Sequence, residues 1–158
     1  MIPPEEFRRY VRRPVLGRLA RCDARLGGAA SEQLMLGTAI AESELNALAQ
    51  RGGPALSMFQ IEPATFDDIY GRYLRLRPRL LTAVRAFMFP ELAPLEQLAG
   101  NQHLACAIAR VKYWMSPRPL PVPGDIDALG AYWKAHYNTS HGAGRTSQWA
   151  YLYRKYVT

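Results

Sequence analysis

The chain has 158 residues, a length typical of one domain with a buried core. Its hydrophobic fraction of 49% is ordinary for a globular protein and excludes a disordered polar chain. The formal net charge of +7 favours an anionic partner, such as nucleic acid, an anionic membrane face or a bacterial wall polymer.

The first 28 residues predict a basic helical N-terminal arm. Pro3-Pro4-Glu5-Glu6 is a good helix start, because proline is tolerated in the first turn and acids favour the positive end of the helix dipole. Pro14 interrupts or restarts the helix, and Gly27-Gly28 ends the arm. Its arginines are Arg8, Arg9, Arg12, Arg13, Arg18, Arg21 and Arg25.

Residues 31–45 predict a buried helix that ends in two acids. The segment is apolar nearly all round and contains no Lys or Arg. We expect Ser31 to be its N-cap, and Gly37 to mark the close approach of a neighbouring helix. Glu42 and Glu44 are two positions apart, so they point in nearly opposite directions and only one can face a cleft.

The middle of the chain alternates breaks with short helices. Gly52-Gly53-Pro54 is a turn, and residues 57–61 are either extended or one helical turn. A helix begins near Pro63 and runs up to Pro78. Another follows and stops before Pro90, and residues 94–100 predict a short helical element.

The last third predicts three helices and one extended connector. Asn101 opens a long helix, and Asp125 begins another. Prolines at 117, 119, 121 and 123 forbid regular structure between them, so we expect a polyproline-type connector. Thr146 or Ser147 caps the last helix. Because no alternating run predicts a strand, we expect a mostly α, single-domain fold over residues 1–158.

Neither metal nor disulfide chemistry is indicated. The histidines (His103, His136 and His141) are not clustered with other ligand types, so we expect no metal site and no cofactor. Cys22 and Cys106 are far apart, and we expect each to pack as a small apolar side chain. No run reaches membrane-spanning length, and no apolar segment follows the basic N-terminal residues. We therefore expect synthesis in the cytoplasm without a cleaved signal.

Glu42 has the surroundings that a general acid requires. Glycoside cleavage needs a carboxylic acid that stays protonated near neutral pH, and partial burial in an apolar setting raises a carboxyl pKa into that range. Glu42 follows Ile40 and Ala41 on a helix without basic residues. Taken alone, a helix-end glutamate is more often a capping or surface residue.

The surrounding pattern resembles the soluble lytic transglycosylase and goose-type lysozyme superfamily. Glu42-Ser43 is followed by the turn 57–60 (SMFQ), where the family has a Gly-Leu-Met-Gln-like turn, and then by a Pro-x-Thr motif at 63–65. Asn101 matches a later family asparagine, and Tyr137-Asn138 matches a Tyr-Asn pair. The resemblance spans about residues 31–144 and implies a lysozyme-like helical fold. Segments 53–65 and 131–139 look most like phage-encoded endolysins.

The resemblance implies a role for each matching residue. Glu42 would act as the catalytic acid and then as the base, with Ser43 binding or orienting substrate beside it. Met58 and Gln60 would line the sugar cleft. Tyr137 would bond near the glutamate or the reacting acetamide, and Asn138 would brace its loop. The implied reaction is cleavage of the MurNAc-GlcNAc β-1,4 bond of peptidoglycan, leaving an anhydromuramoyl end.

Three positions depart from the family pattern. Ser57 stands where the family has glycine, which reduces the backbone freedom of the turn. Glu62 stands before Pro63 in place of a hydrophobic residue, and Thr139 follows the Tyr-Asn pair. Among the nearby acids Glu62, Asp67 and Asp68, Glu62 is the best candidate for a second carboxylate, which an inverting hydrolase would need.

Several alternatives stay open at this stage. The same fold could act as a hydrolytic muramidase, or as a virion-associated enzyme that opens the wall during infection. A basic nucleic-acid-binding helical protein is the non-enzyme alternative. For the leading hypothesis we expect a monomer that acts on peptidoglycan glycan strands in the periplasm after release through a holin-made hole. The Arg-rich arm would contact anionic wall or outer-membrane polymer, and no nucleic acid is expected.

Overall fold

The structure is a computed structural model in which residues 1–139 and 142–157 are described. His141 therefore lies outside the described residues. Helices make up 61% of the chain and the described part contains no sheet, which confirms the mostly α prediction. The extended backbone consists of isolated bridges that join Leu56 to Ala49 and to Ile61.

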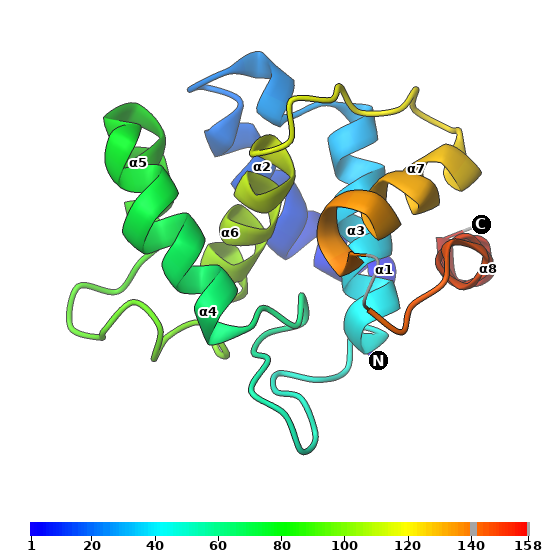
Figure 1. The fold of residues 1–158 in the computed structure, drawn as a ribbon, viewed down its shortest axis with the longest axis horizontal. Helices are drawn as coiled ribbons and strands as arrows, with labels where there is room; N and C mark the ends of the chain where they lie inside the picture. Colours follow the sequence, from blue (N-terminus) through cyan, green and yellow to red (C-terminus); the bar gives the residue numbers. More distant parts are fainter. Residues whose placement is uncertain (140–141, 158) are drawn as a thin grey trace.

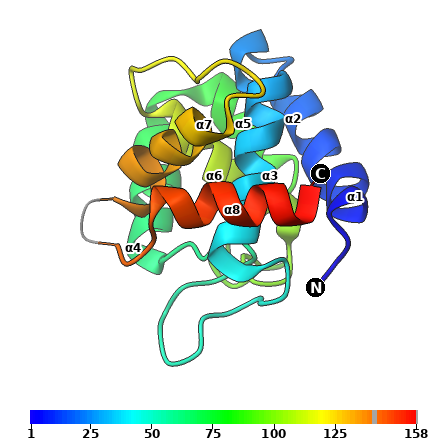
Figure 2. The ribbon, with the colours of Figure 1, turned by 90° about the vertical axis from the view of Figure 1, so that its right-hand side faces the viewer.

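Figure 1 shows α3 and α6 in the middle of the molecule, with α5 on one side and α8 on the other. Figure 2 shows α8 crossing over α3. The α-helices are α1 (Pro4–Phe7), α2 (Arg13–Leu19), α3 (Ala29–Ser43), α4 (Pro63–Phe66), α5 (Pro78–Arg85), α6 (Gln102–Trp114), α7 (Ile126–Trp133) and α8 (Thr146–Val157). Wider π-helical segments (Arg8–Arg12, Asp67–Tyr73 and Lys134–Asn138) and 3-10 turns (Ala24–Leu26 and Leu74–Leu76) extend or join them.

The core forms around α3 and α6, as the apolar sequence of the first predicts. From Leu34 to Ile40 every residue of α3 is buried, and α6 is buried from Leu104 to Val111. The helix α3 begins at Ala29, however, and Gly28 precedes it with a φ of +88°. The prediction that Ser31 is the N-cap is therefore wrong. Its hydroxyl is buried and accepts a hydrogen bond from Arg110 Nε at 3.0 Å.

Gly37 lies where α3 and α8 approach each other most closely. A Cβ built on Gly37 would lie 2.0 Å from Cζ2 of Trp149, whose indole ring is fully buried. The expectation that Gly37 marks the close approach of a neighbouring helix is confirmed, and the neighbour is α8.

Pro14 does not break the N-terminal helix. The chain stays helical from Pro4 to Leu19, with the π-helical segment Arg8–Arg12 before the proline. Pro14 has no N–H, so it cannot donate to the carbonyl of Tyr10. Nε2 of His103 on α6 lies 2.6 Å from that carbonyl oxygen, so a ring N–H replaces the missing donor. The proline is thus tolerated because α6 supplies a partner.

The N-terminal arm packs onto the rest of the protein. Phe7 is buried with its ring 5.9 Å from that of Phe59, and Arg12 is buried in an ion pair with Glu32 at 3.0 Å. Both cysteines are free thiols, and that of Cys106 is buried. Within the described residues, no helix is long and apolar enough to cross a membrane.

The predicted helix starts at Asn101 and Asp125 are confirmed, and one predicted element is not helical. Oδ1 of Asn101 accepts from the backbone N–H of Leu104, and Asp125 caps α7 in the same way, both at 3.0 Å. The prediction of a helix over residues 94–100 is wrong, because these residues form turns. The side chain of Gln97 bonds the backbone of Phe89 and Leu92, which stabilises the turns instead.

Ser57 has the left-handed backbone that the glycine of the family pattern would favour. Its φ is +71°, and its hydroxyl accepts from the N–H of Phe59 at 3.2 Å. We expect Ser57→Ala to be less stable than Ser57→Gly by about 1 kcal/mol, because alanine keeps the left-handed strain and both lose the hydrogen bond. Urea denaturation of the two variants measures the difference. An alanine variant at least as stable as the glycine variant would contradict it.

Candidate active site

A cleft of about 370 Å³ opens beside the C-terminal end of α3. The end of α3, the chain segment 50–65, α6 and the segment after α7 all contribute to it. The lining residues are Glu42, Gln50, Ala55, Gln60, Glu62, Thr65, Lys112, Tyr137, Asn138, Thr139 and Gly142. Segments that are far apart in the sequence therefore meet at Glu42.

Glu42 is a half-buried carboxyl held in a fixed position. Its Oε1 accepts a hydrogen bond from Nε1 of Trp133 at 2.9 Å. Burial raises the pKa of Glu42, while the bond from Trp133 and the charge of Lys112 act in the opposite direction. Burial is the largest effect, so the carboxyl keeps its proton at a higher pH than an exposed glutamate does. This is the property that a general acid needs.

Lys112 supplies a partly buried positive charge to the same cleft. Its Nζ donates to the carbonyl oxygen of Tyr137 at 2.8 Å and lies 4.0 Å from the centre of the Tyr137 ring. Burial lowers the pKa of Lys112, against the attraction of Glu42 and Glu62. The ammonium therefore fixes the Tyr137 segment and adds electrostatic stabilisation for an anionic Glu42 after proton transfer.

Two hydroxyls bind the turn 57–60 to its neighbours. The hydroxyl of Ser43 donates to the carbonyl oxygen of Met58 at 2.9 Å. The hydroxyl of Tyr137 donates to the carbonyl oxygen of Phe59 at 2.7 Å. These bonds hold the turn at a fixed distance from the end of α3. Nε2 of Gln60 donates to the carbonyl oxygen of Ser57 at 2.7 Å, which leaves its Oε1 able to accept from a ligand in the cleft.

The loop after Tyr137 is braced by a lysine. Nζ of Lys134 donates to Oδ1 of Asn138 at 2.8 Å and to the carbonyl oxygen of Gly142 at 2.7 Å. A Cβ on Gly144 would lie 2.4 Å from Cη2 of Trp133, so the loop backbone packs directly on the indole that holds Glu42. Asn138 therefore takes part in this bracing as an acceptor for Lys134.

The structure brings together some of the sequence-predicted residues and separates others. Glu42, Gln60, Tyr137 and Asn138 line one cleft. Met58 does not line it, because its side chain is buried in the core, and Ser43 supports the turn from behind the cleft. The expectation that Met58 contacts sugar in the cleft therefore does not fit its burial, and Ser43 has a structural contact instead of an open face.

The other acids differ in their access to the cleft. Glu62 is exposed and lines it together with Glu42. Glu44 points elsewhere and accepts from the hydroxyl of Tyr156 at 2.9 Å. Asp67 and Asp68 are exposed and do not line the cleft, and Asp68 pairs with Arg72 at 3.0 Å. Glu62 is thus the second carboxylate that this cleft contains.

Sequence reasoning missed Trp133 and Lys112. Trp133 belongs to a set of aromatic residues at helical spacing, which is more often core, and nothing in the sequence singles out Lys112. Their contacts to Glu42 and Tyr137 join residues 91 and 25 positions apart. The one local signal was a lysine in helix 102–114, which is largely apolar but also contains Arg110, and helical periodicity does not tell which neighbour the lysine meets.

Glu42 should reduce the stability of the protein at neutral pH. Because its folded-state pKa is raised, its favourable contribution is present below the unfolded-state pKa and is lost as the pH rises through the folded-state pKa. We therefore expect Glu42→Gln to be more stable than the native protein at pH 7, since glutamine stays neutral and can still accept from Trp133. The gain should disappear below the ordinary glutamate pKa of 4.5.

Urea denaturation of both proteins at the two pH values measures this difference. The matched control is Glu44→Gln, the same change at an exposed residue two positions further along. The measured quantity is the free energy of unfolding of Glu42→Gln minus that of the native protein. A difference that is smaller at pH 7 than at low pH would contradict the burial argument.

Comparison of the chain with models of known protein families, with characterised proteins and with solved structures finds no match.

Proposed function

We propose that the protein is a peptidoglycan lytic transglycosylase that cleaves the MurNAc-GlcNAc β-1,4 bond with Glu42 as its catalytic acid and base. The observation that carries the proposal is geometric: a half-buried glutamate, held by Trp133, lines one cleft with Gln60 and Tyr137. Its burial raises the pKa of the carboxyl. Glycoside cleavage requires such a proton donor. The motif resemblance supplies the substrate class.

The reaction uses one carboxyl twice. Glu42 donates its proton to the glycosidic oxygen as the bond from C1 of the muramoyl sugar to that oxygen breaks. The N-acetyl oxygen of the same sugar stabilises C1. The hydroxymethyl oxygen of that sugar then bonds to C1 and returns its proton to Glu42, so no water is consumed. Lys112 lowers the cost of the ionised Glu42 between the two steps, because its charge attracts the carboxylate.

Side chains of the cleft match the acetamido groups of this substrate. Oε1 of Gln60 is available as an acceptor for an acetamide N–H. The hydroxyl of Tyr137 is buried and donates to the carbonyl oxygen of Phe59, so it holds the turn that carries Gln60 at the edge of the cleft. Asn138, fixed by Lys134, borders the same space.

Hydrolysis is the second candidate, because Glu62 lines the same cleft as Glu42. A carboxylate across the cleft from the acid would activate a water molecule for attack at C1, as in inverting glycosidases. The cleft then belongs to a muramidase, and the product carries a reducing muramic acid end.

Product analysis separates the two reactions. Purified protein is incubated with peptidoglycan and the released fragments are analysed by mass spectrometry. We expect anhydromuramoyl ends, which lack one water relative to the hydrolysis product. Reducing ends would assign the hydrolytic reaction, and the absence of any cleaved glycan at several pH values would contradict the proposed function.

The biological setting is proposed from the sequence. The segments that resemble phage endolysins favour host-cell lysis, with action on the periplasmic wall after release through a holin-made hole. A virion-mounted role uses the same chemistry. The exposed arginines of the N-terminal arm would hold the enzyme to anionic wall or outer-membrane polymer.

A further inference from the structure

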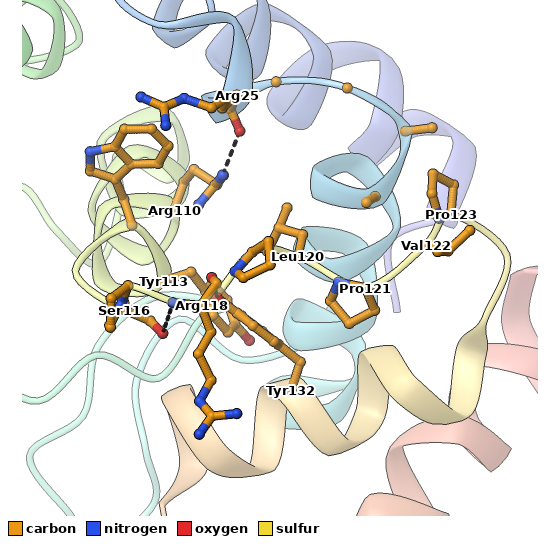
Figure 3. Close-up of a pocket in the computed structure, with 17 residues that line it drawn as sticks. Arg25, Arg110, Tyr113, Ser116, Arg118, Leu120, Pro121, Val122, Pro123 and Tyr132 are labelled. Atoms are coloured by element: carbon orange, nitrogen blue, oxygen red, sulfur yellow. Dashed lines mark hydrogen bonds between the residues drawn. The ribbon is translucent and has the colours of Figure 1, made fainter.

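A second and larger cavity, of about 740 Å³, lies between the start of α3 and the proline connector. Figure 3 shows the connector from Ser116 to Pro123 passing along this space, with Arg25 and Arg110 above its first part. None of the described residues that line it is acidic. It shares no lining residue with the Glu42 cleft, so it is a separate site.

Arg110 brings an unpaired charge to this cavity. The side chain is only 2% exposed, and its Nε and Nη2 donate to Leu26, Ser31 and Arg25. Every one of these acceptors is an uncharged oxygen. In the described part of the chain no hydrogen bond is made by Nη1, and no carboxylate pairs with Arg110. Burial lowers its pKa to about 10, as expected for a desolvated cation.

The position of Arg110 adds to this excess of positive charge. Its bond to Ser31 places the guanidinium beside the first turn of α3, a 15-residue helix without a side-chain N-cap. The N-terminus of a helix carries a partial positive charge and free N–H groups. Ala29 and Ala30 of this turn line the cavity. A buried cation and a positive helix end thus repel each other, and a bound anion would stabilise both.

The acids nearest to this turn do not supply that anion. Asp23 is engaged by Arg25 at 2.7 Å, and Glu32 is engaged by Arg12 at 3.0 Å. The compensating charge is therefore expected from outside the chain.

The apolar part of the cavity has fixed walls. The hydroxyl of Tyr132 donates to the carbonyl oxygen of Arg118 at 2.8 Å, and Gly124 donates to the side chain of Gln33 at 2.8 Å, so the connector is held at both ends. The ring of Trp114 lies beside both Arg25 and Arg110, with the guanidinium carbons 5.1 and 5.8 Å from its centre. A flat or apolar body fits between this ring and the prolines.

We propose that this cavity binds a small organic oxoanion, whose carboxylate or phosphate group lies between Nη1 of Arg110 and the N–H groups that begin α3. The body of the ligand contacts Trp114 and the proline connector. The site is independent of the proposed wall-cutting activity, because it rests on a different cavity.

Phenyl phosphate and phenylacetate are the probes, with phenol as the neutral match, and nuclear magnetic resonance follows the backbone N–H signals of Ala29 and Ala30. We expect saturable shifts with a dissociation constant in the order of 1 mM for at least one anion. Comparison of the two anions shows whether phosphate or carboxylate is preferred. Phenol should bind at least about tenfold more weakly, because it lacks the charge-assisted hydrogen bonds.

Ala30→Glu tests the charge at the site without removing Arg110. An acid in the first turn favours the helix, so the variant should fold, and its carboxylate should take the place of the ligand. We expect binding of the preferred anion to weaken at least about tenfold. Ala30→Gln, of the same size but neutral, should retain clearly more affinity than Ala30→Glu.

Three outcomes would overturn the proposal. The first is that neither anion causes a saturable shift at Ala29 and Ala30. The second is that phenol binds as tightly as the anions. The third is that Ala30→Glu and Ala30→Gln lose the same amount of affinity. The last would show that bulk and not charge controls the cavity.

Discussion

Glu42→Gln is expected to reduce peptidoglycan cleavage by about 100- to 10,000-fold, the usual contribution of a general acid. Glutamine is nearly the same size and its Oε1 can still accept from Trp133, so the cleft should keep its shape. In the proposed reaction, the variant loses the proton that Glu42 would deliver to the leaving oxygen. Release of soluble fragments from purified walls measures the loss.

The matched control is Glu44→Gln. Glu44 is exposed and bonds Tyr156, so the same chemical change two residues along should leave the rate of wall cleavage within about twofold of the native protein, since surface changes are usually small. A Glu42→Gln variant with native activity would remove Glu42 from the mechanism. If both variants fold and both lose activity, the loss in Glu42→Gln cannot be assigned to Glu42 alone.

A basic nucleic-acid-binding protein predicts a different result for the same pair. Its affinity for DNA would fall steeply with salt and would not depend on Glu42. The two hypotheses therefore differ in the result for Glu42→Gln. The wall-cutting hypothesis predicts loss of activity in this variant, and the nucleic-acid-binding hypothesis predicts no change.

Gly37→Ala is expected to have the largest effect on stability. The new Cβ would lie 2.0 Å from Cζ2 and 2.6 Å from two further atoms of the Trp149 ring. That indole is fully buried and stacked on Tyr153 at 5.4 Å, so it cannot rotate away without moving α8. We expect a loss of about 2–3 kcal/mol in the free energy of unfolding, after the helix propensity of alanine is counted.

Gly17→Ala is the control for helix propensity. Gly17 lies in α2, is exposed, and has no atom within 4 Å of its added Cβ. This variant should gain up to about 1 kcal/mol, because alanine favours the helix and nothing must shift. Urea denaturation with an unchanged slope measures both variants. A Gly37→Ala variant as stable as the native protein would show that α3 and α8 can separate at no cost.

The two experiments on α3 also bear on each other. Gly37 sets how closely α8 approaches the helix that carries Glu42, and Glu42 lies five residues further along, in the last turn of α3. A stability loss at Gly37 that leaves the pKa of Glu42 raised would show that the cleft does not depend on the fit of α8. The Trp133 bond and the burial near α7 would then be sufficient.

Local sequence determined the helical framework of this protein. Asn101 and Asp125 start helices because their side chains accept from N–H groups three residues further along, a contact within one turn. The apolar run of α3 predicts its burial, and the spacing of Glu42 and Glu44 predicts that they diverge. Gly37 predicted a close approach for the same kind of local reason, since a missing side chain leaves space.

Only the tertiary structure decided which distant residues contact each other. Ser31 is no N-cap because α3 already begins at Ala29, and its hydroxyl meets Arg110 from 79 positions away. Gln97 holds turns where a helix was expected. Trp133 reaches Glu42 across 91 positions, and Met58 is drawn into the core although its neighbours in the motif line the cleft. Helical periodicity reports which face of a helix is buried, but the identity of the facing group depends on chain folding that brings distant segments together.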